Sequence, residues 1–264
     1  MELKSKPPAY TVSRASIRLK GKAIPGAEER QRDIRGFDQA VHSSSRVVCI
    51  GAGGIISQIA PTLVRKGIGG IKLLDDDVVE TSNLNRQRFY QTDIGKNKAL
   101  ALARNLKREC IAPTSIRAWP FRFEEAIARR IDLSCNVSVC GVDNNPARVS
   151  ASRYFRSKGV PVIFAAVSRD GDHGYVFVQE KHGACIACMF PDIVNDDRYP
   201  CPGTPAIADI LQAVGAFAVY AIDTLLMNRP RAWNYRTISL SDGRFDGALM
   251  VPGREGCRMF APES

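Results

Sequence analysis

The chain lacks a long hydrophobic run, an internal repeat and a low-complexity tract. Its longest weakly polar run, 213–222, is far shorter than the roughly 18 to 20 apolar residues that a membrane span requires. Residues 1–8 include two lysines and two prolines where a signal peptide would have an apolar stretch. We therefore expect no transmembrane helix, no membrane partner and a cytoplasmic protein.

The composition has no disordered or fibrous character. Hydrophobic residues make up 45% of the 264 residues and charged residues 24%, which is ordinary globular usage. The length favours one or two domains. One α/β domain with appendages fits best.

The net charge of +10 is the strongest compositional bias, and half of it lies near the N-terminus. Residues 1–36 hold nine Lys or Arg side chains against four Asp or Glu. Basic and aromatic residues are not interleaved there as in single-strand nucleic-acid binders. We expect a basic N-terminal arm, 1–36, that is solvated or meets an acidic partner or nucleotide phosphates, and we do not expect nucleic acid.

Short apolar runs alternate with helical patterns after this arm. Buried parallel strands are expected at 46–50, 71–74, 137–142 and 160–167. Helices are expected at 55–65, 96–108, 148–158 and 207–227. The alternation predicts an α/β fold, a Rossmann-like, doubly wound, mostly parallel sheet with a C-terminal β extension that contains cysteines. Residues 37–264 would form a single domain, with a core at about 45–170 and a C-terminal part at about 171–264.

A glycine-rich turn follows the first expected strand. Gly51, Gly53 and Gly54 let backbone N–H groups approach a phosphate at the N-terminus of the next helix. Ile56 stands where the dinucleotide fingerprint G-x-G-x-x-G requires glycine. Asp75, after the second strand, is placed to accept hydrogen bonds from ribose hydroxyls, although a solvated acidic turn has the same sequence pattern.

The segment after Asp75 is rich in side chains that suit a nucleotide triphosphate. Arg and Lys neutralise transferring phosphates, and an NAD enzyme has no need of such a cluster. The segment comprises Asp75, Asp76, Asp77, Val78, Val79, Glu80, Thr81, Ser82, Asn83, Leu84, Asn85, Arg86 and Gln87, and Lys98 follows it.

The order of these motifs resembles the ThiF/MoeB/HesA family, adenylating proteins that share their fold with ubiquitin-activating enzymes. The family pattern is a G-x-G-G turn, a D-x-D-x-V strand end and S-N-L-x-R-Q. The likeness extends upstream to Arg30-Gln31 and downstream to Val142-Asp143-Asn144. It covers roughly residues 28–228.

The resemblance implies a nucleotide site with ATP as the substrate. Gly54 and its neighbours would cradle ATP, and Asp75 would hold the ribose. Asp143 would bind Mg²⁺, which prefers oxygen ligands. The residues expected to contact the phosphates or line the site are Gly51, Gly53, Asp77, Ser82, Asn83, Leu84, Asn85, Arg86, Gln87, Lys98 and Asn144.

The resemblance also implies a homodimer. In the family an N-terminal arginine reaches across the dimer to the partner's ATP, and Arg30 occupies that position here. Alternatively, Arg30 is one more solvated charge of the basic arm.

The eight cysteines fall into two groups. Those in or beside apolar runs are expected to be structural: Cys49, Cys110, Cys135 and Cys140. Those in turn-rich C-terminal segments indicate metal binding or catalysis in a cytosolic chain: Cys185, Cys188, Cys201 and Cys257.

Cys185 and Cys188 have the C-x-x-C spacing of a zinc-ligand pair. In the family a second C-x-x-C completes a structural zinc site, whereas this chain has Cys257 followed by Phe260 where the second cysteine would stand. Two interpretations stay open. Cys185, Cys188 and Cys257 hold Zn²⁺, or the segment is a metal-free knuckle packed by its apolar residues.

Cys201 matches the loop cysteine that in some family members takes the activated acyl group or sulfur. A deprotonated thiol there would attack an acyl-adenylate. Pro202 and Pro205 replace the small and acidic residues that usually follow this cysteine. A zinc ligand and an inert loop cysteine therefore remain alternatives.

The sequence thus predicts ATP-dependent adenylation of the C-terminal carboxylate of a small ubiquitin-like or sulfur-carrier protein ending in Gly-Gly, with transfer to a cysteine thiol as a second step. A catalytically silent adaptor with this fold is the main alternative. An NAD-dependent oxidoreductase is favoured only by the generic sheet and Asp75. The residues assigned to catalysis are Arg30, Arg86, Lys98, Asp143 and Cys201.

Overall fold

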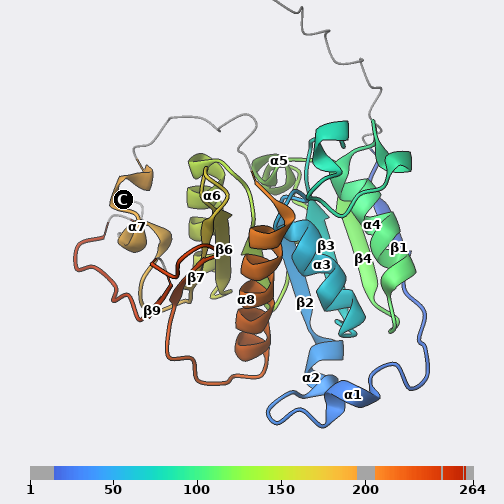
Figure 1. The fold of residues 1–264 in the computed structure, drawn as a ribbon, viewed down its shortest axis with the longest axis horizontal. Coiled ribbons are helices and arrows are strands. Elements are labelled where there is room, and N and C mark those ends of the chain that lie inside the picture. Colours follow the sequence, from blue (N-terminus) through green and yellow to red (C-terminus); the bar gives the residue numbers. More distant parts are fainter. Residues whose placement is uncertain (1–14, 195–205, 245, 258, 260–264) are drawn as a thin grey trace, which may run out of the picture.

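Residues 15–194, 206–244, 246–257 and 259 are described by a computed structural model, and within them nine strands form one sheet (Figure 1). The strands are β1 (Ile17–Lys20), β2 (Arg46–Ile50), β3 (Gly70–Leu74), β4 (Ser115–Trp119), β5 (Val137–Cys140), β6 (Val162–Val167), β7 (His173–Gln179), β8 (Tyr235–Ser239) and β9 (Gly247–Leu249). The helices are α1 (Glu29–Arg32), α2 (Gln39–Ser44), α3 (Ile56–Arg65), α4 (Lys98–Glu109), α5 (Phe123–Ala128), α6 (Asn145–Ser157), α7 (Ile186–Met189) and α8 (Ala208–Leu226), with 3₁₀ turns η1 (Thr81–Asn83), η2 (Gln91–Asp93) and η3 (Pro191–Val194).

The sheet order is β1-β4-β3-β2-β5-β6-β7-β8-β9. The five strands from β4 to β6 in this order pair in parallel. The outer strands β1, β7, β8 and β9 pair antiparallel with their neighbours. The α/β prediction is confirmed, including the mostly parallel centre and the C-terminal β extension.

Helices cover both faces of the sheet, with α3, α4 and α8 on one side and α5 and α6 on the other (Figure 1). The first core includes Ile59 of α3 and Ile210 of α8, both completely buried. The second core includes Phe155 of α6 and the stacked rings of Phe164 and Phe177. The central strands are buried on both faces, which is why their sequences are almost entirely apolar.

Helix α8 is the one helix among the described residues that is long and apolar enough to cross a membrane, with a mean hydropathy of 1.4. It contains the run at 213–222, which by itself is too short to span a membrane. In the fold, 56% of the apolar window is buried, and α8 packs against α3, β6 and β7. A helix that covers a sheet requires the same apolar composition.

Part of the segment expected to be a basic arm belongs to the sheet. Strand β1 pairs with β4, and its side chains alternate between partly buried and exposed. Ile17 and Leu19 pack against the first core, while Arg18 and Lys20 point outward. Apolar and charged residues alternate in this segment, which is the two-residue periodicity of an edge strand, but the surrounding basic residues make the pattern hard to distinguish in the sequence.

Candidate active site

The register of the parallel strands brings three chain segments to one edge of the sheet. Ile50, the last residue of β2, is paired with Leu74 and with Cys140. The N–H of Gly51 donates to the carbonyl of Leu74 at 2.8 Å, and that of Gly141 donates to Ile50 at 3.0 Å. The glycine-rich turn, the Asp75 segment and the Asp143 segment therefore start side by side at the carboxyl ends of the strands, where ligands bind in such sheets.

Each of the three glycines of the turn is required for a different structural reason. Gly51 has φ of 92°, a left-handed conformation that favours glycine. A Cβ on Gly54 would lie 3.0 Å from a methyl group of Leu211, so Gly54 allows α8 to approach. A Cβ on Gly53 would meet no described atom within 4 Å. Gly53 is therefore the glycine that leaves the backbone open to a ligand.

Ile56, the departure from the dinucleotide fingerprint, is accommodated by a glycine elsewhere. Its side chain is completely buried, and a Cβ on Gly141 would lie 2.8 Å from its Cγ1. The close approach between α3 and the segment after β5 thus uses Gly141 where the fingerprint would use a glycine at position 56.

Gly141→Ala should lower the free energy of unfolding by about 1–3 kcal/mol, because the added methyl group overpacks a closed core contact. Gly53→Ala, with open space at its Cβ, should leave stability within about 1 kcal/mol of wild type while weakening ATP binding. Urea unfolding and calorimetric ATP titration measure the two effects. Equal stability of Gly141→Ala and wild type would contradict the proposed compensation.

The carboxylate of Asp75 closes the glycine-rich turn. It accepts hydrogen bonds from the N–H of Ala52 at 2.6 Å and from the N–H of Asp77 at 2.8 Å. Burial, reinforced by the neighbouring Asp77 and opposed by Lys98, raises the pKa of Asp75 to about 6. The predicted ribose ligand thus lies at the turn, poised between its neutral and charged forms near that pH.

Lys98 faces the same acidic segment. Its Nζ lies 2.9 Å from Oδ2 of Asp77, and its side chain is 12% exposed. Burial disfavours the ammonium form, but the carboxylates of Asp75 and Asp77 outweigh burial and raise the pKa of Lys98. A permanently charged ammonium group therefore stands beside the predicted ribose ligand.

Asn97, which the sequence analysis did not single out as a site residue, holds these groups together. Its Nδ2 donates to the carbonyls of Asp75 at 2.7 Å and Asp77 at 3.1 Å. Its Oδ1 accepts from the N–H of Leu100 at 3.0 Å and caps α4. Asn97 is buried. The helix expected at 96–108 begins at Lys98, so Asn97 is its N-cap, and asparagine is one of the residue types that signal such a position.

The loop that carries Arg86 is fixed by Gln58 of α3, a second residue the sequence analysis missed. Gln58 Nε2 donates to the carbonyl of Arg86 at 3.0 Å, and Arg88 Nε donates to Gln58 Oε1 at 2.9 Å. The Arg86 guanidinium donates to the carbonyl of Ser82 at 2.5 Å and to Asn85 Oδ1 at 2.9 Å. Arg86 is therefore anchored to the helix that starts at the glycine-rich turn.

Several other predicted ATP contacts have structural roles. Asn83 Oδ1 accepts from the N–H of Glu80 at 3.0 Å, and Asn144 Oδ1 caps α6 through the N–H of Ala147 at 2.9 Å. Leu84 packs against the first core. Gln87 Oε1 is buried and has no hydrogen-bond partner among the described residues.

Asp143 and Arg30 lie in different places. Asp143 is exposed just after β5, at the edge that carries the glycine-rich turn. Arg30 is exposed on α1, and its neighbour Gln31 donates to the carbonyl of Lys66 at 3.0 Å, beyond the C-terminal end of α3. Since ten helical residues span about 15 Å, Arg30 lies far from the turn at the other end of α3.

The cysteines that were expected to be structural are free thiols within the fold. Cys49, Cys110 and Cys140 are buried, and Cys135 is half-buried. Burial raises the pKa of Cys140 to about 11 and that of Cys135 to about 12, so both thiols stay protonated. Cys201 lies outside the described residues, and its proposed role stays a prediction.

The three other C-terminal cysteines converge. Cys185 Sγ lies 3.6 Å from Cys188 Sγ and 3.5 Å from Cys257 Sγ. Thiolates placed tetrahedrally at about 2.3 Å from zinc would be about 3.8 Å apart, so these side chains fit the metal. The backbone N–H of Arg254 donates to Cys188 Sγ at 3.4 Å and would support a thiolate there.

Comparison with known proteins gives a consistent family assignment. The SAMP-activating enzyme E1 of Haloferax volcanii is 28% identical over 200 residues, covering 74% of this chain and 72% of that protein. The sulfur carrier protein adenylyltransferase of Thermus thermophilus is 30% identical over 188 residues, covering 68% of this chain and 69% of that protein.

Among solved structures, Escherichia coli MccB with ATP matches with a TM-score of 0.69 and 20% identity, covering 84% of this chain and 68% of that one. That likeness shows a shared fold. The sequence pattern of the ThiF family matches residues 28–258, nearly the whole chain. The protein therefore belongs to the ThiF family.

Proposed function

We propose that this protein is an ATP-dependent adenylyltransferase that activates the C-terminal carboxylate of a small sulfur-carrier or ubiquitin-like protein ending in Gly-Gly. The main support for this proposal is that the open backbone of Gly53, the carboxylate of Asp75 and the cation of Lys98 meet at one edge of the sheet. The names of the Haloferax and Thermus relatives support the same substrate class.

In the proposed reaction, a carboxylate oxygen of the carrier attacks the α-phosphorus of ATP. The bond between the α-phosphorus and the oxygen that bridges it to the β-phosphorus breaks. Pyrophosphate leaves, and an acyl-adenylate forms. The N-terminus of α3 and the cations of Lys98 and Arg86 stabilise negative charge on the phosphates. The chain contributes mainly by positioning the reactants and neutralising charge.

We assign Mg²⁺ to Asp143. Its exposed carboxylate at the edge that carries the nucleotide residues supplies the oxygen ligand that this ion prefers, and the remaining ligands would come from phosphates and water. When bound, Mg²⁺ would neutralise phosphate charge. Asn144 positions the Asp143 segment by capping α6.

The proposed activity is tested by exchange of labelled pyrophosphate into ATP, with purified protein and a candidate carrier. We expect exchange that requires the intact carrier and disappears with a carrier lacking its last glycine. ATP binding without exchange, for every carrier tested, would identify a silent adaptor. Tighter binding of NAD than of ATP would indicate an oxidoreductase.

We propose a homodimer in which Arg30 acts on the partner's ATP, because Arg30 lies too far from the glycine-rich turn of its own chain. Arg30→Ala and Lys98→Met should each inactivate the enzyme. In an equal mixture of the two variants, about half of the dimers contain one chain of each kind. Each such heterodimer has one intact site of its two, so activity should return to about a quarter of wild type.

The matched control is Arg32→Ala, on the same short helix, whose side chain pairs with Glu28 at 3.1 Å. This variant should keep full activity. Mixed Arg30→Ala and Lys98→Met chains that stay inactive after verified subunit exchange would show that Arg30 does not act across a dimer.

Two further features complete the proposal. Zn²⁺ bound by Cys185, Cys188 and Cys257 would hold the C-terminal segment on α7, and elemental analysis of protein purified without added metal would measure it. The seven cysteines in the described residues form no disulfide, as is usual in a reducing compartment, and we propose a cytoplasmic protein. Transfer of the acyl group to Cys201 stays a prediction from the sequence.

A further inference from the structure

The N-terminal segment that carries Arg30 is fastened to the fold far from the glycine-rich turn. Figure 1 shows α1 and α2 at the end of the molecule where α3 and α8 end, opposite the carboxyl ends of the parallel strands. Gln31 of α1 and Gln39 of α2 both donate through Nε2 to the carbonyl of Lys66, at 3.0 and 3.1 Å. One carbonyl at the C-cap of α3 therefore holds both short helices, and Arg30 directly precedes the first of these glutamines.

The side chain of Lys66 makes two further contacts. Its Nζ lies 4.9 Å from the centroid of the Phe37 ring, in the connection between α1 and α2, and it forms an ion pair with the carboxylate of Asp223 of α8. The Phe37 ring packs against the ring of His42 with centroids 5.4 Å apart, and His42 Nδ1 lies 3.8 Å from Asp223 Oδ1. These four residues, the Lys66 cluster, join the N-terminal segment to α3 and α8.

Asp223 is an unusual residue for its position. It lies in the last turn of α8, where the helix dipole disfavours a negative charge, and it is only 8% exposed. Burial lowers the pKa of His42, so Lys66 supplies the positive charge that balances Asp223 at neutral pH. A mostly buried ion pair is a poor source of stability, because desolvation offsets the attraction between the charges, but it can select one arrangement of the elements that carry it. Here one of these elements is α8, and the other is the residue whose carbonyl holds Gln31.

We propose that Asp223 and Lys66 are positioning residues for Arg30: their ion pair fixes the segment 28–42 so that Arg30 reaches the ATP of the partner subunit. This role rests on the proposed function, because it depends on the action of Arg30 across the dimer. Lys66 lies at the end of α3 opposite the glycine-rich turn of its own chain. The effect of the pair on catalysis is therefore expected only through Arg30.

Complementation between variants distinguishes positioning of Arg30 from damage to the chain's own nucleotide site. Asp223→Asn should lower pyrophosphate exchange about 10- to 100-fold, the range for a small misplacement of a catalytic group. In an equal mixture with Lys98→Met, each heterodimer has one site with an intact Lys98 and an intact segment from its partner, so activity should return to about a quarter of wild type. In an equal mixture with Arg30→Ala, both sites of each heterodimer receive a defective segment, and activity should stay at the level of the two variants.

Glu109→Gln is the matched control, because it breaks an ion pair with Arg65 of 2.7 Å at the same end of α3 that involves neither Lys66 nor the segment 28–42. This variant should exchange pyrophosphate as wild type does. The reverse complementation pattern, in which Asp223→Asn is restored by Arg30→Ala and not by Lys98→Met, would show that Asp223 supports the nucleotide site of its own chain and would overturn the proposal. Full activity of Asp223→Asn would also overturn it.

A readout that does not need catalysis separates this test from the test of adenylation. Amide hydrogen exchange in 28–42 should be faster in Asp223→Asn than in wild type and Glu109→Gln, with unchanged rates in the parallel strands. Equal rates would contradict the positioning role, whereas a wild-type protein without pyrophosphate exchange would contradict adenylation. If Asp223→Asn does not fold, the double variant Lys66→Met and Asp223→Leu, which leaves no unpaired charge, replaces it in both measurements with the same expected results.

Discussion

Lys98→Met is expected to reduce kcat/KM for pyrophosphate exchange by about 10²- to 10³-fold, the usual cost of removing one group that stabilises developing charge. The ammonium group lies 2.9 Å from Asp77 Oδ2 and is largely shielded from solvent. The two acidic neighbours raise its pKa, so the lost charge is present throughout the neutral pH range. Methionine retains the length and apolar character of the side chain.

Lys96→Met is the matched control for this experiment. Lys96 lies two residues earlier, its side chain is 49% exposed, and its Nζ lies 3.8 Å from Asp93 rather than near the Asp75 segment. We expect exchange within about twofold of wild type, as for most surface substitutions. Equal losses in the two variants, with both proteins folded, would remove Lys98 from the proposed catalytic group.

Asp75→Asn is expected to raise the KM for ATP by about 10- to 100-fold at pH 7.5, because hydrogen bonds to a charged group contribute about 1.5–3 kcal/mol. Ribose hydroxyls donate to the carboxylate more strongly than to an amide oxygen. In wild type, ATP affinity should also fall as the pH drops below about 6, where Asp75 takes up a proton. The Asn variant should lack this inflection.

The stability of the ligand-free protein should change in the opposite direction. Because the pKa of Asp75 is raised in the folded state to about 6, its contribution to the free energy of unfolding is largest below its ordinary pKa near 4 and is lost as the pH rises through about 6. The difference between wild type and Asp75→Asn isolates this group. Parallel stability curves from pH 4 to 7 would contradict the assigned pKa.

Four of the five parallel strands and the long helices could be predicted because their patterns are local. Strand β2 is found at the expected residues, and the expected strand at 71–74 is one residue longer as β3. The parallel strand β4, the edge strand β1 and the short helices α1, α2, α5 and α7 were not expected, and β7, β8 and β9 were expected only as a C-terminal β extension without residue ranges. Their few residues form these elements through tertiary contacts, so each pattern alone is too short to be distinguished from a turn.

Site residues could be predicted where the side-chain type and the motif spacing both indicate nucleotide binding. Residues whose role depends on packing in the fold could be predicted less well. Asp75 and Lys98 are brought together as expected. Asn97 has an N-cap signal in the sequence but no signal for its hydrogen bonds to the Asp75 segment, and Gln58 has no distinctive signal for its contact with the Arg86 segment. Likewise, Ile56 appears unfavourable until Gly141 is found against it.

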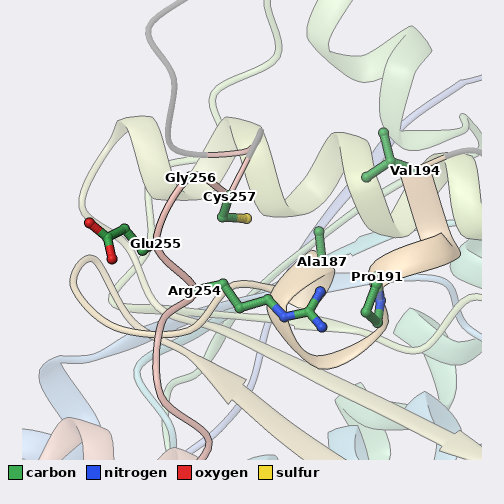
Figure 2. Close-up of a pocket in the computed structure, with 7 residues that line it drawn as sticks. All are labelled: Ala187, Pro191, Val194, Arg254, Glu255, Gly256 and Cys257. Carbon is green, nitrogen blue, oxygen red and sulfur yellow. The ribbon is translucent and has the colours of Figure 1, made fainter.

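The cysteines illustrate the same distinction. The C-x-x-C spacing placed Cys185 and Cys188 on one turn, because that spacing is local. Cys257 is 72 positions from Cys185, yet the folded C-terminal segment brings the two sulfurs to 3.5 Å. Cys257 and Arg254 line one pocket together with Ala187 of α7 (Figure 2), an arrangement that no spacing rule specifies.

Detection of the acyl-adenylate itself tests the central claim most directly. The protein is incubated with ATP, Mg²⁺ and a small carrier protein ending in Gly-Gly, and the intact carrier is weighed by mass spectrometry after rapid quenching. We predict a carrier heavier by one adenylyl group, formed by wild type and Lys96→Met and nearly absent with Lys98→Met. An unmodified carrier with the wild-type enzyme, for carriers that bind it in the presence of ATP, would contradict the proposed adenylation.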